Sequence, residues 1–138
     1  MRFKIGSFID RGLDHINNDQ VCQDAVIASK LDDRFLIAVS DGAGSAKKSD
    51  EGSKLLLECV DIKFKELSNN TPLEIANVTD LVMGAVDDFR VKCASFEGEE
   101  CLRDFACTLV GAVGDAAGAC IAFHLGDGAV LIASRSEE

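Results

Sequence analysis

The sequence predicts an α+β domain built on antiparallel sheet, and two observations lead to this class. Strand-like segments gather in two groups, with two helical segments between them. Such segregation favours antiparallel sheet with helices packed outside it, whereas alternation of strands and helices would favour a parallel sheet. Short turns rich in aspartate and glycine separate neighbouring strands within each group. With 138 residues, the chain is expected to form a single domain, residues 1–138, with a sizeable core.

The expected strands are short runs bounded by polar turns. Residues 35–39 form a continuous apolar run, which is typical of a strand covered on both faces. Asp32 and Asp33 make a tight turn before this run, so residues 24–41 are expected to form a hairpin. A second hairpin is expected around residues 114–118. The full set of expected strands is residues 2–9, 24–30, 35–39, 105–113, 119–125 and 129–133.

Two helices are expected between the groups of strands. Residues 50–68 carry apolar side chains at helical spacing, with charged residues on the other side. Ser49 and Asp50 are candidate N-caps for this helix. Thr71-Pro72-Leu73-Glu74 has the form of a capping box with proline at the first helical position. Residues 72–96 then form one helix or two, and residues 97–100 an exposed acidic loop.

The composition restricts the class of partner. The chain carries a formal net charge of −10, whereas a nucleic acid or an anionic membrane needs a basic face, so neither is expected to bind. No apolar run approaches the roughly 20 residues of a membrane span, and the N-terminus lacks a signal-peptide core. The six cysteines lack Cys-x-x-Cys spacing, which favours reduced, mostly buried thiols over a zinc site or a disulfide framework. These observations predict a cytoplasmic protein.

Residues 34–52 organise the chain, because a buried strand ends there at Asp41-Gly42, a loop of small residues follows, and a helix begins. The loop Gly42-Ala-Gly-Ser-Ala-Lys-Lys-Ser49 comes close to the phosphate-binding pattern Gly-x4-Gly-Lys-Ser/Thr. Lys47, however, stands where the pattern needs a glycine that lets backbone amides wrap the phosphate. Nucleotide binding is therefore the weakest of the functional hypotheses.

Aspartates at the ends of apolar strands indicate a metal site instead. Asp41-Gly42 offers a carboxylate and an unobstructed carbonyl, both of which are ligands for a hard divalent cation. An isolated Asp-Gly pair is usually only a turn. Here the pattern recurs, because Asp127-Gly128 also closes an apolar strand and Asp24 opens one. The three aspartates can meet at one rim of a sheet, where they would form a metal site.

Neither histidine belongs to a catalytic pattern that the sequence itself shows. His15 lies in a polar loop, where a surface histidine is the plain interpretation. His124 ends a strand, and a polar group at a strand edge is the corresponding interpretation. No Ser/His/Asp or Cys/His constellation is legible in the sequence.

Five motifs occur together along nearly the whole chain: Cys22-Gln-Asp-Ala25, Val39-Ser-Asp-Gly-Ala-Gly-Ser-Ala46, Glu51-Gly52, Asp104-Phe-Ala-Cys-Thr-Leu109 and Leu125-Gly-Asp-Gly-Ala129. In this order and rough spacing they resemble the PP2C-type metal-dependent protein phosphatases. The likeness is strongest to a bacterial branch with Gln-Asp where most members have Glu-Asp. The resemblance implies an α-β-β-α sandwich of two antiparallel sheets with outer helices. It also implies a site for two or three Mn²⁺ or Mg²⁺ ions.

The resemblance implies a role for each candidate site residue. Asp41 matches the aspartate that bridges two metal ions, and Gly42 matches the residue that gives its carbonyl to one of them. Asp24 matches an acid that holds metal-bound water, and Asp127 matches the aspartate that binds a third, looser ion. The family's phosphate-binding arginine is missing, and His15 near its place is the candidate phosphate-binding residue. In such a site, water activated by the metal ions attacks phosphoserine or phosphothreonine.

The family domain is longer than this chain, which resembles only its N-terminal part. The part without a counterpart holds further metal-binding acids. The leading hypothesis is therefore a serine/threonine phosphatase acting on phosphoproteins, truncated or weakly active as this chain alone. The alternative is a non-catalytic phosphoprotein-binding or regulatory module. Apolar sheet surface left bare is expected to be covered by a second copy or by a complementing chain.

Overall fold

The computed structural model describes residues 3–67, 69–96 and 102–133. The four strands form one antiparallel sheet in the order β1-β2-β3-β4. The predicted α+β class is therefore confirmed, and the two expected hairpins are the two halves of the sheet. The elements in chain order are α1 (Leu13–Asn17), β1 (Ala25–Leu31), β2 (Arg34–Ser40), α2 (Ser49–Lys65), α3 (Ile75–Ala94), the 3-10 turn η1 (Leu102–Phe105), β3 (Leu109–Asp115) and β4 (Cys120–Leu125).

The two hairpins join in the middle of the sheet. Strand β2 pairs with β3, although both long helices lie between them in the sequence, and Leu36 lies opposite Val113. Because the two strands are antiparallel, the end of β2 lies beside the start of β3. The pairing continues past the strands, where Gly42 forms an isolated bridge with Cys107. The segment after β2 is therefore fixed against the segment before β3.

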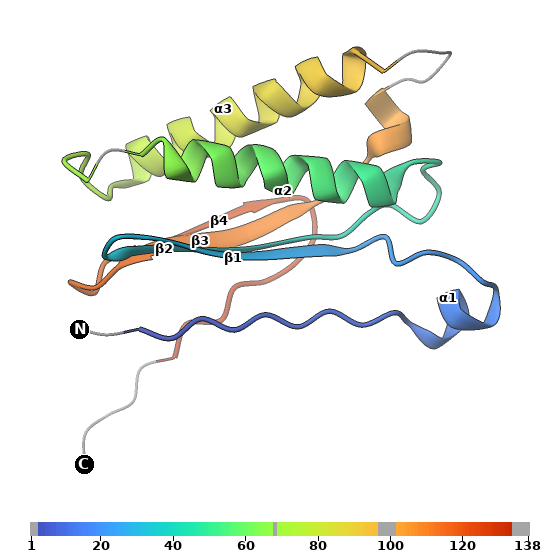
Figure 1. Cartoon of the computed structure of the whole chain (residues 1–138), viewed down its shortest axis with the longest axis horizontal. Helices are drawn as coiled ribbons and strands as arrows, with labels where there is room; N and C mark the ends of the chain where they lie inside the picture. Colours follow the sequence, from blue (N-terminus) through green and yellow to red (C-terminus); the bar gives the residue numbers. More distant parts are fainter. Residues whose placement is uncertain (1–2, 68, 97–101, 134–138) are drawn as a thin grey trace.

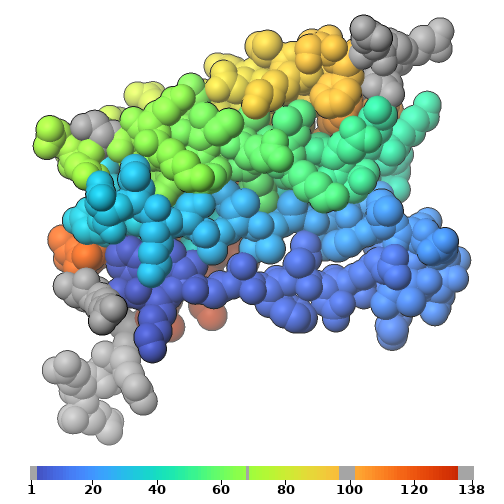
Figure 2. Space-filling model, in the orientation of Figure 1, coloured from blue at the N-terminus to red at the C-terminus, as the bar shows by residue number. Residues whose placement is uncertain are grey.

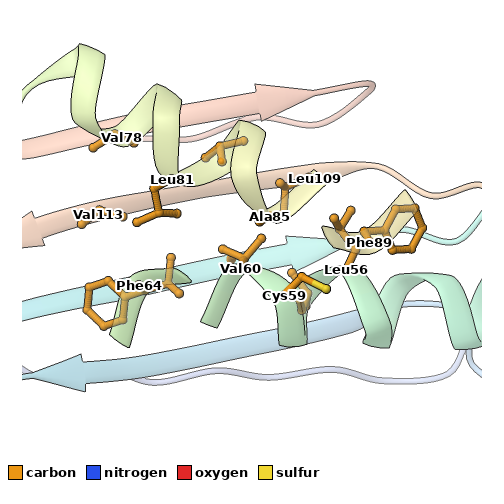
Figure 3. Close-up of a cluster of buried hydrophobic side chains, with 14 of the residues drawn as sticks. Leu56, Cys59, Val60, Phe64, Val78, Leu81, Ala85, Phe89, Leu109 and Val113 are labelled. Carbon is orange, nitrogen blue, oxygen red and sulfur yellow. The ribbon is translucent and has the colours of Figure 1, made fainter. Parts of the chain in front are cut away.

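Helices α2 and α3 cover one face of the sheet (Figure 1). Alternate residues of each strand point to that face, because successive side chains of a strand point to opposite sides. Leu36 of β2, Val60 of α2 and Val113 of β3 are fully buried there. Figure 3 draws the side chains of this core and labels ten of them: Leu56, Cys59, Val60, Phe64, Val78, Leu81, Ala85, Phe89, Leu109 and Val113.

Neither of the two long helices lies on the opposite face, and the short α1 lies on that side near one end of the sheet (Figure 1). Residues 3–10 and 129–133 run along this side as extended chain, and Figure 2 shows the first of them in blue along the lower edge of the molecule. The strands expected at residues 2–9 and 129–133 are not formed in their described residues. A strand needs a neighbour for its backbone N–H and C=O groups, and neither segment has one.

A cavity of about 320 Å³ remains between these two segments and the sheet. Side chains that point away from the helices, such as Ile37 and Val39, form most of its floor. Phe8 and Leu131 of the flanking segments are 85% and 93% exposed. The face is thus apolar and only partly covered. Residues from the sheet that line the cavity are Val26, Ile27, Ile37, Ala38, Val39, Val110, Gly111 and Ala112.

The helix starts differ from the expectation. Helix α2 begins at Ser49, and no side chain caps it; the Ser49 hydroxyl is buried without a hydrogen-bond partner among the described residues. The capping box expected before α3 is not formed, because α3 begins only at Ile75. The Asn77 side-chain amide instead donates to the Pro72 carbonyl at 2.8 Å. Residues 75–94 form one helix rather than two. The acidic loop expected at residues 97–100 lies outside the described residues.

The described cysteines are free thiols. Cys59 and Cys93 are buried between the helices and the sheet, whereas Cys120 is exposed on β4. Cys101 lies outside the described residues. In the described ranges, no helix is both long and apolar enough to cross a membrane.

Candidate metal centre

Four aspartates from separate parts of the chain line one cavity of about 480 Å³ at the end of the sheet. Asp24 precedes β1, Asp41 follows β2, and Asp127 follows β4, while Asp10 comes from the extended N-terminal segment. In an antiparallel sheet the start of one strand and the end of its neighbour lie at the same edge. The three aspartates expected at strand ends therefore reach one rim, as the sequence predicted, and their roles remain predictions.

Asp41 is fixed at the end of β2 by hydrogen bonds on both sides. The Thr108 N–H donates to the Asp41 carbonyl at 2.9 Å, and the next amide, that of Gly42, donates to the Gln23 carbonyl at 3.1 Å. The second bond joins the segment after β2 to the residue just before Asp24. The Ser53 hydroxyl of α2 also donates to the Gln23 carbonyl, at 2.6 Å. These contacts bring Asp24 and Asp41 together.

Gly42 must be glycine at this junction. A Cβ atom added there would lie 2.5 Å from the Gln23 carbonyl oxygen and 2.8 Å from the Ser49 carbonyl oxygen. Both neighbours are backbone atoms that cannot move aside without shifting the turn. Any side chain at this position would separate Asp41 from Asp24, so the glycine keeps the two carboxylates in register.

The carboxyl groups of Asp24 and Asp41 are close enough to share a hydrogen bond. Partial burial raises the pKa of Asp24 above its usual range, and the hydrogen bond and the charge of Asp41 raise it further, whereas His15 lowers it. Two carboxylates in contact repel each other, and a cation between or beside them relieves that repulsion. The pair is therefore an electrostatic site for positive charge.

Asp127 lies in the turn after β4, between two glycines with positive φ. Gly126 has φ +90° and Gly128 has φ +135°, and a Cβ on Gly128 would lie 2.4 Å from a methyl of Val110. The turn therefore packs tightly against β3, and it holds Asp127 at the cavity. The second histidine, His124, is exposed on β4 opposite Val110 and does not line this cavity.

His15 lies in the short helix α1, close enough to Asp24 for its positive charge to lower the pKa of that carboxyl. Its side chain is not among the residues that line the cavity. The neighbouring Arg11 guanidinium donates to the Gln20 carbonyl at 3.1 Å, which closes the loop that carries α1. His15 is thus at the margin of the site, and its expected phosphate-binding role remains a prediction.

The loop after Asp41 is not a phosphate cradle. Four of the amides that such a loop would offer are already used: Gly42 donates to Gln23, Ala43 to Ala106 at 2.8 Å, Ala46 to Ala43 at 2.9 Å, and Lys48 to Asp104 at 2.8 Å. The Lys48 ammonium lies 5.4 Å from the centre of the Phe96 ring and forms an ion pair with Glu51. The structure therefore argues against nucleotide binding here.

The sequence assigned no role to two polar residues of the cavity, Asp10 and Thr108, although Thr108 belongs to the motif of residues 104–109. Asp10 begins the segment of residues 10–23 that was expected to be a polar loop, and nothing in its local pattern marks it. Thr108 is one of several small residues before β3. Its position could be found only from the register of β2 with β3, which places residue 108 beside residue 41.

The donor set of the cavity fits a hydrated divalent cation. Among the described residues, no three His, Cys, Asp or Glu side chains stand close enough to enclose a cation by themselves. Mg²⁺ binds through one or two carboxylates while it keeps several of its waters, and Mn²⁺ also prefers carboxylate, carbonyl and water. The adjacent Asp24 and Asp41 carboxylates meet that need, and Asp10 and Asp127 add negative charge to the same cavity.

The comparisons with known proteins give the family to which this α+β chain belongs. The model of the protein phosphatase 2C family matches residues 11–138, so the chain belongs to that family. It is similar to serine/threonine-protein phosphatase 3 of Escherichia coli (strain K12), with 31% identity over 126 residues, which cover 88% of this chain and 49% of the relative. The chain thus spans about half the length of this curated relative. No solved structure gives a significant match.

Proposed function

We propose that this chain is the metal-binding part of a serine/threonine protein phosphatase that hydrolyses phosphomonoesters on phosphoproteins. The observation that carries the proposal is the contact of Asp24 with Asp41 at the wall of a cavity that Asp127 also lines. Membership of the protein phosphatase 2C family and the 31% identical phosphatase support the class of reaction. Residues 1–138 would be the N-terminal part of a longer catalytic domain.

Each candidate residue has one role in this proposal. Asp41 and the Gly42 carbonyl would hold Mn²⁺ or Mg²⁺, and Asp127 would hold a further, looser ion. Asp24 would accept hydrogen bonds from water and orient it. His15 would bind a phosphate oxygen, in agreement with its place beside the acids. When bound, the cations would lower the pKa of water and offset the negative charge of the phosphate.

The test of the metal site is Mn²⁺ binding by this chain, measured by calorimetric titration. Asp41→Asn keeps the shape of the side chain and removes its charge, and we expect it to lower the affinity at least about tenfold. Asp33→Asn is the matched control, since Asp33 is an exposed acid in the turn between β1 and β2, at the opposite end of these strands. Equal Mn²⁺ binding by Asp41→Asn and Asp33→Asn would contradict the proposed site.

A non-catalytic phosphoprotein-binding module is the second candidate, and it is favoured by the absence of a three-ligand cluster among the described residues. Hydrolysis of an aryl phosphate with Mn²⁺ separates the two. Turnover by the chain, alone or with a polypeptide matching the rest of the E. coli relative, that disappears in Asp41→Asn supports the phosphatase. Binding of a phosphoserine peptide with no turnover in either condition supports the module.

The partly covered face of the sheet would be the docking surface for the remaining half of such a domain, whether continuous with this chain or separate. The face is apolar, with Ile37 39% and Val39 49% exposed, and the chain spans only half of its relative. We expect this chain to bind a polypeptide matching that half, and Ile37→Lys to abolish the binding. If sedimentation instead shows a dimer that Ile37→Lys disperses, a second copy is the occupant and the complementing chain is wrong.

A further inference from the structure

Thr108 contacts two of the segments that carry the acids of the candidate metal centre, those of Asp41 and Asp127. Its hydroxyl oxygen accepts the Asp41 N–H at 3.1 Å, and its own N–H donates to the Asp41 carbonyl at 2.9 Å. Its carbonyl accepts the Ser40 hydroxyl at 2.6 Å. On the other side, a Cβ on Gly126 would lie 2.9 Å from the Thr108 methyl carbon, so this methyl packs against the turn that ends in Asp127.

The bond to the hydroxyl satisfies the Asp41 N–H just beyond the regular strand pairing, between the last pair of β2 with β3 and the isolated bridge of Gly42 with Cys107. The regular register of β2 with β3 ends at Val39 and Val110. Beyond it, the Asp41 N–H has no backbone carbonyl among its hydrogen-bond partners in the described residues, and the Thr108 side chain takes that place. The Thr108 hydroxyl therefore adds a side-chain contact to the backbone bonds that hold the Asp41 carbonyl and the Gly42 amide, and it is the group that fixes the Asp41 N–H.

We propose that Thr108 is a positioning residue of the metal centre, whose hydroxyl orients Asp41 and whose methyl group supports the turn of Asp127. The inference rests on the proposed function, since it needs Asp41 to be a cation ligand. Groups that orient the ligands of a metal change its affinity typically about 10–100-fold when they are removed. A threonine with a merely structural role would change the stability of the fold and leave the affinity of the folded molecules unchanged.

The test compares variants that differ by one group. Thr108→Ser keeps the hydroxyl, Thr108→Ala removes it, and Thr108→Val removes it while keeping the size of the side chain. Thr79→Val is the matched control, because the Thr79 hydroxyl donates within α3 to the Ile75 carbonyl, away from the cavity. Mn²⁺ affinity is measured by calorimetric titration and by the electron paramagnetic resonance signal of free Mn²⁺, and urea unfolding without metal gives the stability.

We expect Thr108→Ala and Thr108→Val to lower Mn²⁺ affinity about tenfold or more, and Thr79→Val to have no effect. Thr108→Ser, which loses only the methyl group, should lower the affinity less than either of the variants that lack the hydroxyl. Unchanged affinity in the two variants without the hydroxyl would overturn the proposal. So would failure of both to fold while Thr108→Ser folds, because Thr108 would then be structural. If the unchanged chain binds no Mn²⁺, or binds it equally after Asp41→Asn, the proposed metal site itself is wrong, which is a different result.

Discussion

The two faces of the sheet differ in how far they are covered, although they are made by the same strands. Along β2, Leu36, Ala38 and Ser40 point to the helices and are at most 3% exposed. Their neighbours Ile37 and Val39 point to the other side and are 39% and 49% exposed. Alternate residues of β2 therefore lie in a packed core and on a partly exposed surface.

The residue pattern of β2 is typical of a strand that is covered on both faces, because apolar side chains of this strand point to both sides of the sheet. The helices complete one face. The candidate metal centre borders the other, since Val26, Val39 and Val110 line both the cavity of the acids and the cavity under the terminal segments. We therefore expect that a polypeptide that covers the open face also completes the metal site.

The largest expected difference between the faces is in stability. Leu36→Ala on the helix side should lower the free energy of unfolding by about 2–5 kcal/mol, because it leaves a cavity in a packed core. Ile37→Ala, one residue further along, should lower it by about 1 kcal/mol or less, because that side chain is already partly in water. Urea unfolding of both variants measures the difference. Equal losses would show that the open face is covered in solution.

Elements whose signals are local could be predicted from the sequence. The turn at Asp32 and Asp33 and the helical spacing of residues 50–68 each lie within a short window, and both were found. The terminal segments were predicted as strands from the same kind of pattern, but a strand exists only when a neighbour takes its hydrogen bonds. The N-cap expected at Ser49 is wrong because Ser49 is the first residue of α2, with Lys48 at the cap position, and its hydroxyl is buried without a hydrogen-bond partner among the described residues.

The candidate metal centre could be predicted from the sequence to about the same extent as the fold. Carboxylates at the ends of apolar strands are visible in the sequence, and the antiparallel topology brings Asp24, Asp41 and Asp127 to one cavity. Asp10 and Thr108 were missed because their place depends on long-range contacts: a loop that returns to the sheet, and the register of two strands separated by both helices. Neither contact leaves a mark within a few residues of sequence.

The thiols give a second way to compare the faces. Burial raises the pKa of Cys93 to about 11, and the nearby thiols of Cys107 and Cys59 add to the shift. Cys120 lies on β4 in register with Gly114, on the open side, and is exposed. Because the thiolate is the reactive form, a shift from 9.0 to about 11 alone slows Cys93 about 100-fold at neutral pH.

Alkylation by iodoacetamide, followed by peptide mass spectrometry, measures these rates. Cys120 should be modified first, and Cys93 at least about 100-fold more slowly in the folded chain. Urea should bring the two rates together, because the difference is a property of the fold. Comparable alkylation rates of Cys120 and Cys93 without urea would mean that the helix layer opens readily in solution. The two faces would then not differ in how well they protect a thiol.

A smaller effect is expected at the acid that sequence inspection missed. Asp10→Asn should weaken Mn²⁺ binding about twofold to fivefold, because it removes one exposed negative charge from the cavity. Asp14→Asn is the control, since Asp14 is an exposed acid of α1 that does not line the cavity. The effect of Asp10→Asn should shrink at high salt, which screens exposed charges. Equal affinities for the two variants would remove Asp10 from the site.

The smallest expected effect is a gain in the stability of the fold when the charge of Asp24 is removed. The pKa of Asp24 is raised by burial and by Asp41, so the folded chain binds this proton more tightly than the unfolded chain does. Its contribution to stability is therefore present at low pH and is lost as the pH rises above the ordinary value of 3.8.

At neutral pH without metal, Asp24→Asn should raise the free energy of unfolding by less than about 1 kcal/mol, since the group is partly exposed. The same variant should bind Mn²⁺ more weakly, and Mn²⁺ should stabilise the unchanged chain more than it stabilises Asp24→Asn. Urea unfolding with and without Mn²⁺ measures both quantities. Opposite signs for stability and affinity would identify Asp24 as a residue placed for a cation rather than for the fold. A loss of stability in the metal-free variant would show instead that Asp24 holds the start of β1 in place.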